Sequence, residues 1–229
     1  MANTDRGGSV PTPLADILSQ ARRAGFLGPG PIGPHLAHAE AFAGLARRQP
    51  GSSGLSRPRL LDLGSGGGLP GLVIAVEWLE AALVLLDANQ RRTDFLVRAV
   101  SRLHLEDRVI VVNERAETYG RDPVQRASFD GVVVRSFGPP AVVAECAAPF
   151  LKVGGWVIVS EPPTAPGGVP AVSGGGGPSR WPVEHLEAFG LEPGEFLQEG
   201  FGYQVLHQRE VCPDRFPRRN GVPSKNPWF

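Results

Sequence analysis

The segment "LLDLGSGGGLPG", residues 60–71, constrains the fold of this chain more than any other feature. An apolar run reaches Asp62, and five glycines then follow within eight residues, together with a proline. Glycine lets the backbone approach a ligand closely, but each glycine loses more conformational entropy on folding than other residues do. A turn that binds no ligand would not need so many. We therefore expect a strand, a ligand-binding loop and a helix that begins near Pro70. A glycine-rich turn without a ligand is the alternative.

Strands and helices are predicted to alternate around this loop. Apolar runs predict strands at 59–63, 82–87, 108–113, 129–137 and 156–161, and helical patterns predict helices at 70–79, 89–105 and 140–151. This alternation indicates a parallel sheet covered on both faces. A last helix over 181–189 and an antiparallel pair within 195–211 are expected to close it. The predicted fold class is α/β, a doubly wound, mostly parallel sheet with an antiparallel last strand.

Three regions are predicted along the chain. Residues 1–57 are expected to form a small helical extension and a linker, with helices within 14–25 and 35–48. Residues 58–212 are expected to form one ligand-binding domain, which contains a flexible Pro/Gly/Ser-rich loop at 162–180. Residues 213–229 form a basic tail.

Composition narrows the class of protein. The net charge is zero, which argues against a surface that is basic overall but allows a local basic patch. The two cysteines, Cys146 and Cys212, lie far apart, so they predict neither a disulfide framework nor a zinc site and fit a reducing compartment. No apolar run has membrane-spanning length, and no signal-peptide pattern is present. We expect a cytoplasmic monomer with no metal and no membrane partner.

Two classes of cofactor fit the glycine loop. Gly66-x-Gly68-x-x-Gly71 matches the dinucleotide pattern, whereas Gly64-x-Gly66-x-Gly68 matches the loop of methyl-donor enzymes. Asp87 ends the second predicted strand, where a carboxylate can accept both ribose hydroxyls in either class. Asp87 could instead cap the following helix. Asp62 is expected to be a structural acid rather than a catalytic base.

Three further features favour the methyl donor. "RAE" (115–117) follows the third strand, Arg135 ends the fourth, and "FLKVGGWVIV" precedes the fifth. The set resembles the class I S-adenosylmethionine-dependent methyltransferases. The resemblance implies that the donor lies against Gly64, Ser65, Gly66, Gly68, Leu69, Asp87, Ala88, Ala116, Glu117 and Arg135. Within that set Asp87 is expected to hold the ribose and Ala116-Glu117 the adenine. The helix that starts near Pro70 is expected to offer backbone donors to the donor's carboxylate.

Within that class the chain resembles the bacterial small-subunit rRNA guanine-N7 methyltransferases, the glucose-inhibited-division B family. The matching residues are Pro70-Gly71, Arg92, Phe95-Leu96, "RSF" at 135–137 and the tail "RFPRRNGVPSKNP". The resemblance covers roughly residues 58–160 and 203–227. It implies S-adenosylmethionine as cofactor and 16S rRNA or the small ribosomal subunit as partner.

The chain also departs from this family's pattern. It has Ser160-Glu161-Pro162 where the family has a lysine, and its N-terminal half lacks the family's usual motifs. A divergent relative that methylates a small molecule or a protein, or a donor-binding protein without catalysis, therefore remains an alternative.

The expected chemistry is an in-line displacement at the methyl group. Guanine N7 carries an in-plane lone pair, so positioning in a dry site suffices without a general base. Arg135 is the candidate catalytic residue, in contact with guanine O6 or a phosphate; the alternative is an ion pair with a loop acid such as Glu117. In the tail, Arg218, Arg219 and Lys225 are expected to contact RNA, with aromatic residues between them. The alternative is an extension that folds over the sheet and packs its aromatics.

Overall fold

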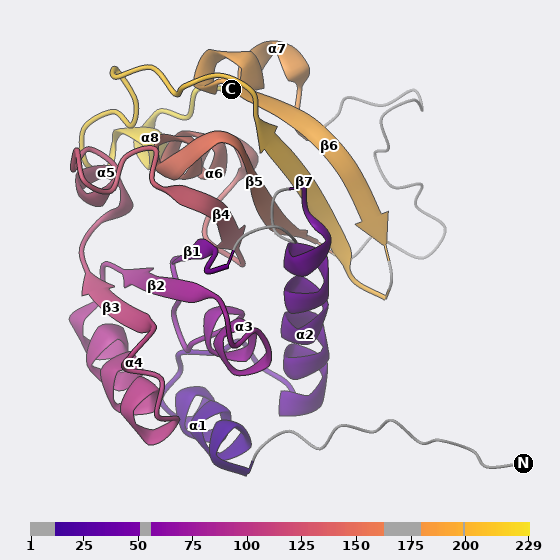
Figure 1. The fold of residues 1–229 in the computed structure, drawn as a ribbon, viewed down its shortest axis with the longest axis vertical. Coiled ribbons are helices and arrows are strands. Elements are labelled where there is room, and N and C mark those ends of the chain that lie inside the picture. The colour runs from indigo at the N-terminus through magenta and orange to yellow at the C-terminus, as the bar shows by residue number, and fades with distance from the viewer. Residues whose placement is uncertain (1–11, 51–55, 163–179, 199) are drawn as a thin grey trace, which may run out of the picture.

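The computed structural model describes residues 12–50, 56–162, 180–198 and 200–229. A seven-stranded sheet in the order β3-β2-β1-β4-β5-β7-β6 runs through the molecule (Figure 1). Its strands are β1 Arg59–Leu63, β2 Ala82–Asp87, β3 Val109–Asn113, β4 Phe129–Val134, β5 Leu151–Glu161, β6 Leu191–Gln198 and β7 Gly202–Gln208. The first five strands pair in parallel, and β7 runs antiparallel to both of its neighbours. The predicted fold class is confirmed.

Helices cover both faces of the sheet (Figure 1). They are α1 Thr12–Arg23, α2 Ile32–Arg48, α3 Gly71–Glu77, α4 Gln90–Arg102, α5 Ala116–Tyr119, α6 Pro140–Ala147, α7 Val183–Leu186 and α8 Val222–Lys225, with 3-10 turns η2 Ala148–Phe150 and η3 Glu187–Phe189. Side chains alternate along each strand, so Leu60 and Leu61 enter different hydrophobic clusters. Residues of α1 and α2 lie in the same cluster as α3 and α4, so the N-terminal helices share their core with the sheet.

Several boundaries differ from the sequence prediction. Strand β5 begins at Leu151 rather than at 156, because the residues expected to form a turn before the strand are part of it. The pairing of β5 with β4 shifts its register in this part. Strand β6 begins at Leu191, and α8 was not predicted. Most of the loop expected at 162–180, and of the extreme N-terminus, lies outside the described residues.

Candidate functional site

The glycine loop lies at the carboxyl edge of the parallel strands, where open α/β sheets bind ligands. Gly64 (φ +76°) and Gly68 (φ +97°) adopt left-handed backbone that disfavours other residues. A Cβ at Gly64 would lie 2.6 Å from Phe137, beside a cavity, whereas one at Gly68 would lie 2.4 Å from Leu72 of α3. The absence of a side chain at Gly68 therefore allows close packing of the loop on α3. Gly68 lines none of the cavities described below, and its contact with the donor stays a prediction.

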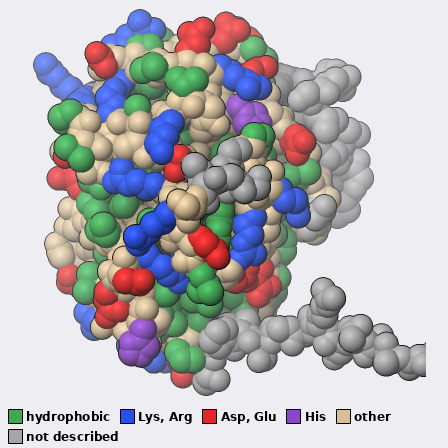
Figure 2. Space-filling view, viewed as in Figure 1, with side chains coloured by type: hydrophobic (Ala, Val, Ile, Leu, Met, Phe, Trp, Pro, Cys, Tyr) green, Lys and Arg blue, Asp and Glu red, His purple; other side chains and the backbone are tan. Residues whose placement is uncertain are grey.

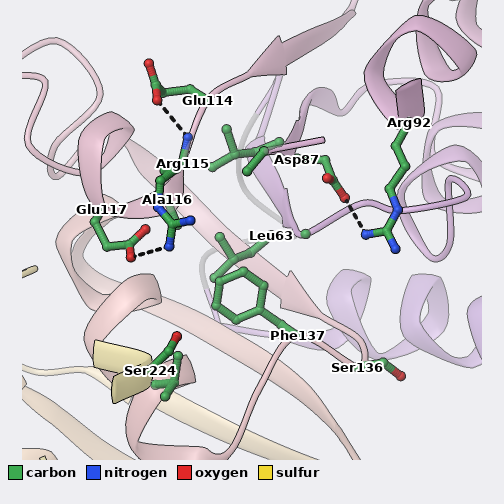
Figure 3. A pocket seen from close by; sticks show the side chains of 14 residues that line it. Leu63, Asp87, Arg92, Glu114, Arg115, Ala116, Glu117, Ser136, Phe137 and Ser224 are labelled. Carbon is green, nitrogen blue, oxygen red and sulfur yellow. Dashed lines mark hydrogen bonds and ion pairs between the residues drawn. The ribbon is translucent and has the colours of Figure 1, made fainter. Parts of the chain in front are cut away.

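Two adjoining cavities, of about 270 and 240 Å³, share Gly64, Arg92 and Ser136; Figure 3 shows the first of them. The first, here called the donor cavity, is lined by the predicted residues Gly64, Asp87, Ala88, Ala116 and Glu117. The second is lined by the predicted residues Ser65, Gly66, Leu69 and Arg135. Tertiary structure thus brings together every predicted donor residue except Gly68. Ser224, which the sequence did not indicate, also lines the donor cavity.

Asp87 at the end of β2 organises the glycine loop. Its Oδ2 accepts from the backbone N–H of Gly66 (2.9 Å) and from Arg92 (3.5 Å), and its Oδ1 accepts from the N–H of Asn89 (2.8 Å). The N-cap of α4 is Asn89, whose side chain accepts from Arg91 and Arg92, so the alternative role of Asp87 as the cap is wrong. Asp87 is instead a carboxylate held against the donor cavity.

Asp62 is buried beneath the same loop, and its Oδ2 accepts from the N–H of Gly71 (3.0 Å) at the start of α3. The start of this helix was expected to offer backbone donors to the donor's carboxylate; the structure commits the amide of Gly71 to Asp62. Burial raises the pKa of Asp62 to about 7, although hydrogen bonds from Ser65 and Gly71 oppose the shift. Asp62 therefore ties the loop to α3.

Glu117 forms part of the wall of the donor cavity and is almost fully buried. Its Oε1 accepts from Arg115 (2.8 Å) and from the backbone N–H of Gly221 (2.7 Å). Burial by itself would raise the pKa of Glu117, but these hydrogen bonds outweigh it and hold the pKa below its usual range. Glu117 is thus a fixed carboxylate at the position where an adenine was expected.

A third cavity, of about 440 Å³, adjoins the loop at Arg135, Ser136 and Phe137 and is called here the acceptor cavity. Arg135 donates to Nδ1 (2.6 Å) and to the carbonyl oxygen (3.4 Å) of His35 in α2. The alternative ion pair between Arg135 and Glu117 is therefore wrong. Since Arg135 lines both the loop cavity and the acceptor cavity, it lies at their boundary.

His38 and Glu161 supply polar groups to the acceptor cavity. His38 stacks on Phe201, with 4.5 Å between the ring centroids, and burial together with Arg135 and His35 lowers its pKa to about 4. Glu161 accepts from Arg180 and from the indole N–H of Trp181 (2.7 Å). The acid that departs from the family's pattern is therefore paired with a cation.

The basic tail is folded onto α6. Arg218 is paired with the buried carboxylate of Glu145, and Phe216 packs against Phe189 and Trp228. The expectation that Arg218 contacts RNA is corrected, because its guanidinium is committed within the fold. Arg219 and Lys225 are exposed. Figure 2 shows Lys and Arg side chains near the middle of the viewed face, interleaved with acidic ones.

Comparison with known proteins shows which family this chain belongs to. The family model described as rRNA small subunit methyltransferase G matches residues 52–161. "Ribosomal RNA small subunit methyltransferase G" of Deinococcus deserti is 33% identical over 171 residues, which are 75% of this chain and 68% of that protein. The protein of the same name from Thermotoga maritima is 33% identical over 168 residues, 73% and 68% of the two chains. This chain belongs to the rRNA small subunit methyltransferase G family.

Membership in the methyltransferase G family confirms the family resemblance seen in the sequence. It also confirms the class, an S-adenosylmethionine-dependent methyltransferase. Solved structures agree in fold. A Corynebacterium glutamicum protein has a TM-score of 0.58 at 15% identity, covering 89% of this chain and 93% of that chain. An O-methyltransferase family protein from Burkholderia thailandensis has a TM-score of 0.56 at 15% identity, covering 77% and 57%.

Two further properties of the described part of the chain bear on its class. None of its helices is long and apolar enough to span a membrane. Within those same residues, no group of three or more His, Cys, Asp or Glu side chains is arranged to hold a metal ion.

Proposed function

We propose that this chain transfers the methyl group of S-adenosylmethionine to N7 of a guanine in 16S rRNA. The observation that carries the proposal is the junction of the donor-side cavities with the acceptor cavity at Arg135. With the ribose proposed at Asp87 and the adenine at Ala116-Glu117, the sulfonium end of the donor is directed along the glycine loop toward that junction.

The acceptor cavity suits a base that has left its stack. Phe137 and Phe201 supply aromatic surface, and the neutral imidazole of His38 stacks on Phe201. Enzymes that act on a base must first extrude it or use an unstacked one. Guanine N7 needs no general base, so the site has only to align the lone pair with the methyl group and exclude water.

Arg135 is proposed to position the acceptor. Its bond to His35 places the guanidinium at the boundary between the loop and acceptor cavities. From there it can contact O6 or a phosphate, but it cannot use the common O6/N7 grip because N7 must stay open to attack.

The pairing of Glu161 makes this rim compatible with RNA as the substrate. An unpaired carboxylate at this rim would repel phosphate, but Arg180 neutralises Glu161. The exposed Arg219 and Lys225 remain proposed phosphate contacts. We further propose that residues 58–212 form the methyltransferase domain and that the protein acts as a cytoplasmic monomer on the small subunit.

The test uses purified protein, methyl-tritiated S-adenosylmethionine and small ribosomal subunits from cells that lack the guanine-N7 modification. We expect label in the RNA at N7 of a guanine, none with fully modified subunits, and none with the Asp87→Ala variant. Donor binding without transfer to RNA would contradict the proposed substrate and favour the alternative of a small molecule or a protein.

A further inference from the structure

The C-terminal tail reaches the donor cavity at two points. Ser224 of α8 lines the cavity, and Figure 3 shows its side chain across the cavity from Leu63 and Phe137. Three residues earlier, the backbone N–H of Gly221 donates to Oε1 of Glu117 over 2.7 Å. Gly221 has φ +78°, the left-handed region in which glycine is favoured. A segment that is distant in sequence thus completes a wall built from the ends of β1 to β4.

Several bonds fix the tail in this place. Arg126 donates to the carbonyl oxygens of Cys212 (2.6 Å) and Phe216 (2.7 Å), and Arg121 donates to that of Pro217 (2.7 Å). The side chains of Asn220 and Thr118 bond to each other, with Nδ2 and Oγ1 3.0 Å apart. Such anchors extend along the whole approach to α8, so the tail is fixed against the methyltransferase domain and is not a free arm.

We propose that this tail is part of the donor site, in which Ser224 contacts the adenosine end of S-adenosylmethionine and Gly221 orients Glu117 for the adenine. The hydrogen bonds from Arg115 and Gly221 both fall on Oε1 of Glu117, which leaves Oε2 to accept from the adenine amino group. The Ser224 hydroxyl, as donor or acceptor, can serve another polar atom of the adenosine. The inference rests on the proposed donor and adds Ser224 and Gly221 to its site.

The test measures binding of S-adenosylhomocysteine to the full chain by titration calorimetry. Ser224→Leu puts an apolar side chain into the donor cavity, so we expect its affinity to fall at least about tenfold, equivalent to about 1.4 kcal/mol. Asn226→Ala changes an exposed side chain just beyond α8 and is expected to bind as wild type does. Circular dichroism and thermal unfolding establish that both variants are folded.

A second measurement needs no substitution. Hydrogen exchange of the wild-type tail amides, including that of Gly221, should slow when S-adenosylhomocysteine binds. Wild-type affinity in folded Ser224→Leu, or unchanged exchange in the tail upon binding, would overturn the role of the tail while leaving the proposed function standing. Failure of the wild-type protein to bind S-adenosylhomocysteine would overturn both.

Discussion

Arg218 holds the carboxylate of Glu145, a side chain with 0% exposure, through its backbone N–H (2.8 Å), its Nε (2.9 Å) and its Nη2 (2.6 Å). The same Nη2 also donates to the carbonyl oxygen of Asn226, so one guanidinium connects α6 to the residue that caps the end of α8. A residue that resembles a phosphate contact in the sequence is therefore a structural clamp.

Arg218→Ala should destabilise the protein, because it leaves Glu145 buried without its cation. Breaking a buried pair in this way costs about 3–5 kcal/mol, and chemical denaturation would measure the loss. The matched control is Arg219→Ala, whose side chain is exposed. It should unfold as wild type does. Wild-type stability with weakened RNA binding in Arg218→Ala would restore the prediction made from the sequence.

Arg219→Ala should weaken binding to small-subunit RNA. Loss of one phosphate contact lowers the salt slope of the binding constant by about one. Binding is measured by filter retention at several salt concentrations. An unchanged slope would show that Arg219 does not contact phosphate.

Asp87→Ala should weaken binding of S-adenosylhomocysteine by roughly a hundredfold, since hydrogen bonds to a carboxylate contribute about 1.5–3 kcal/mol each. Part of the loss comes from the released amide of Gly66. Asp94→Ala removes an exposed carboxylate from α4, which bonds only Gln90 in the described structure, and should leave binding unchanged. Calorimetry distinguishes the two. Equal affinities in the two variants would contradict the placing of Asp87 at the ribose.

Asp62 should make stability depend on pH. Its pKa is raised from 3.8 to about 7 by burial, so between these values the folded state binds more protons than the unfolded state. The free energy of unfolding should therefore fall as pH rises through this window, by up to about 4 kcal/mol at 1.36 kcal/mol per unit. Asp62→Asn can still accept from Gly71 and should lack this component. Parallel curves for the two proteins between pH 4 and 7 would contradict the raised pKa.

Gly71→Ala should destabilise the loop. An added Cβ would lie 2.4 Å from Leu85 and 2.5 Å from the Asp62 carboxylate, and overpacking of this kind costs about 1–3 kcal/mol. Gly33→Ala is the control, because a Cβ there meets nothing within 4 Å and lies near the start of α2. It should be neutral or stabilising by up to about 1 kcal/mol. Thermal unfolding measures both, and an equal effect of the two would argue against the tight packing at Gly71.

The order of strands and helices, the fold class, the glycine loop and most of the residues that line the two cavities beside it could be predicted from the sequence. These are local signals: hydrophobic periodicity sets each element, and a parallel sheet then carries the ends of successive strands to one edge. Gly64 and Asp87 could be assigned because the first directly follows a strand and the second ends one, and Ala116 because it lies just beyond β3.

The partners of the charged side chains could not be predicted from the sequence and are set by the tertiary fold. Arg135 bonds His35, which is 100 positions away, and Glu117 bonds Gly221, which is 104 positions away. Arg218 and Arg219 are neighbours in the chain, yet one is clamped on Glu145 and the other is exposed. Charge and spacing in a sequence do not specify such pairs, because which carboxylate a cation meets depends on how distant segments pack, and that packing is set by the whole hydrophobic core.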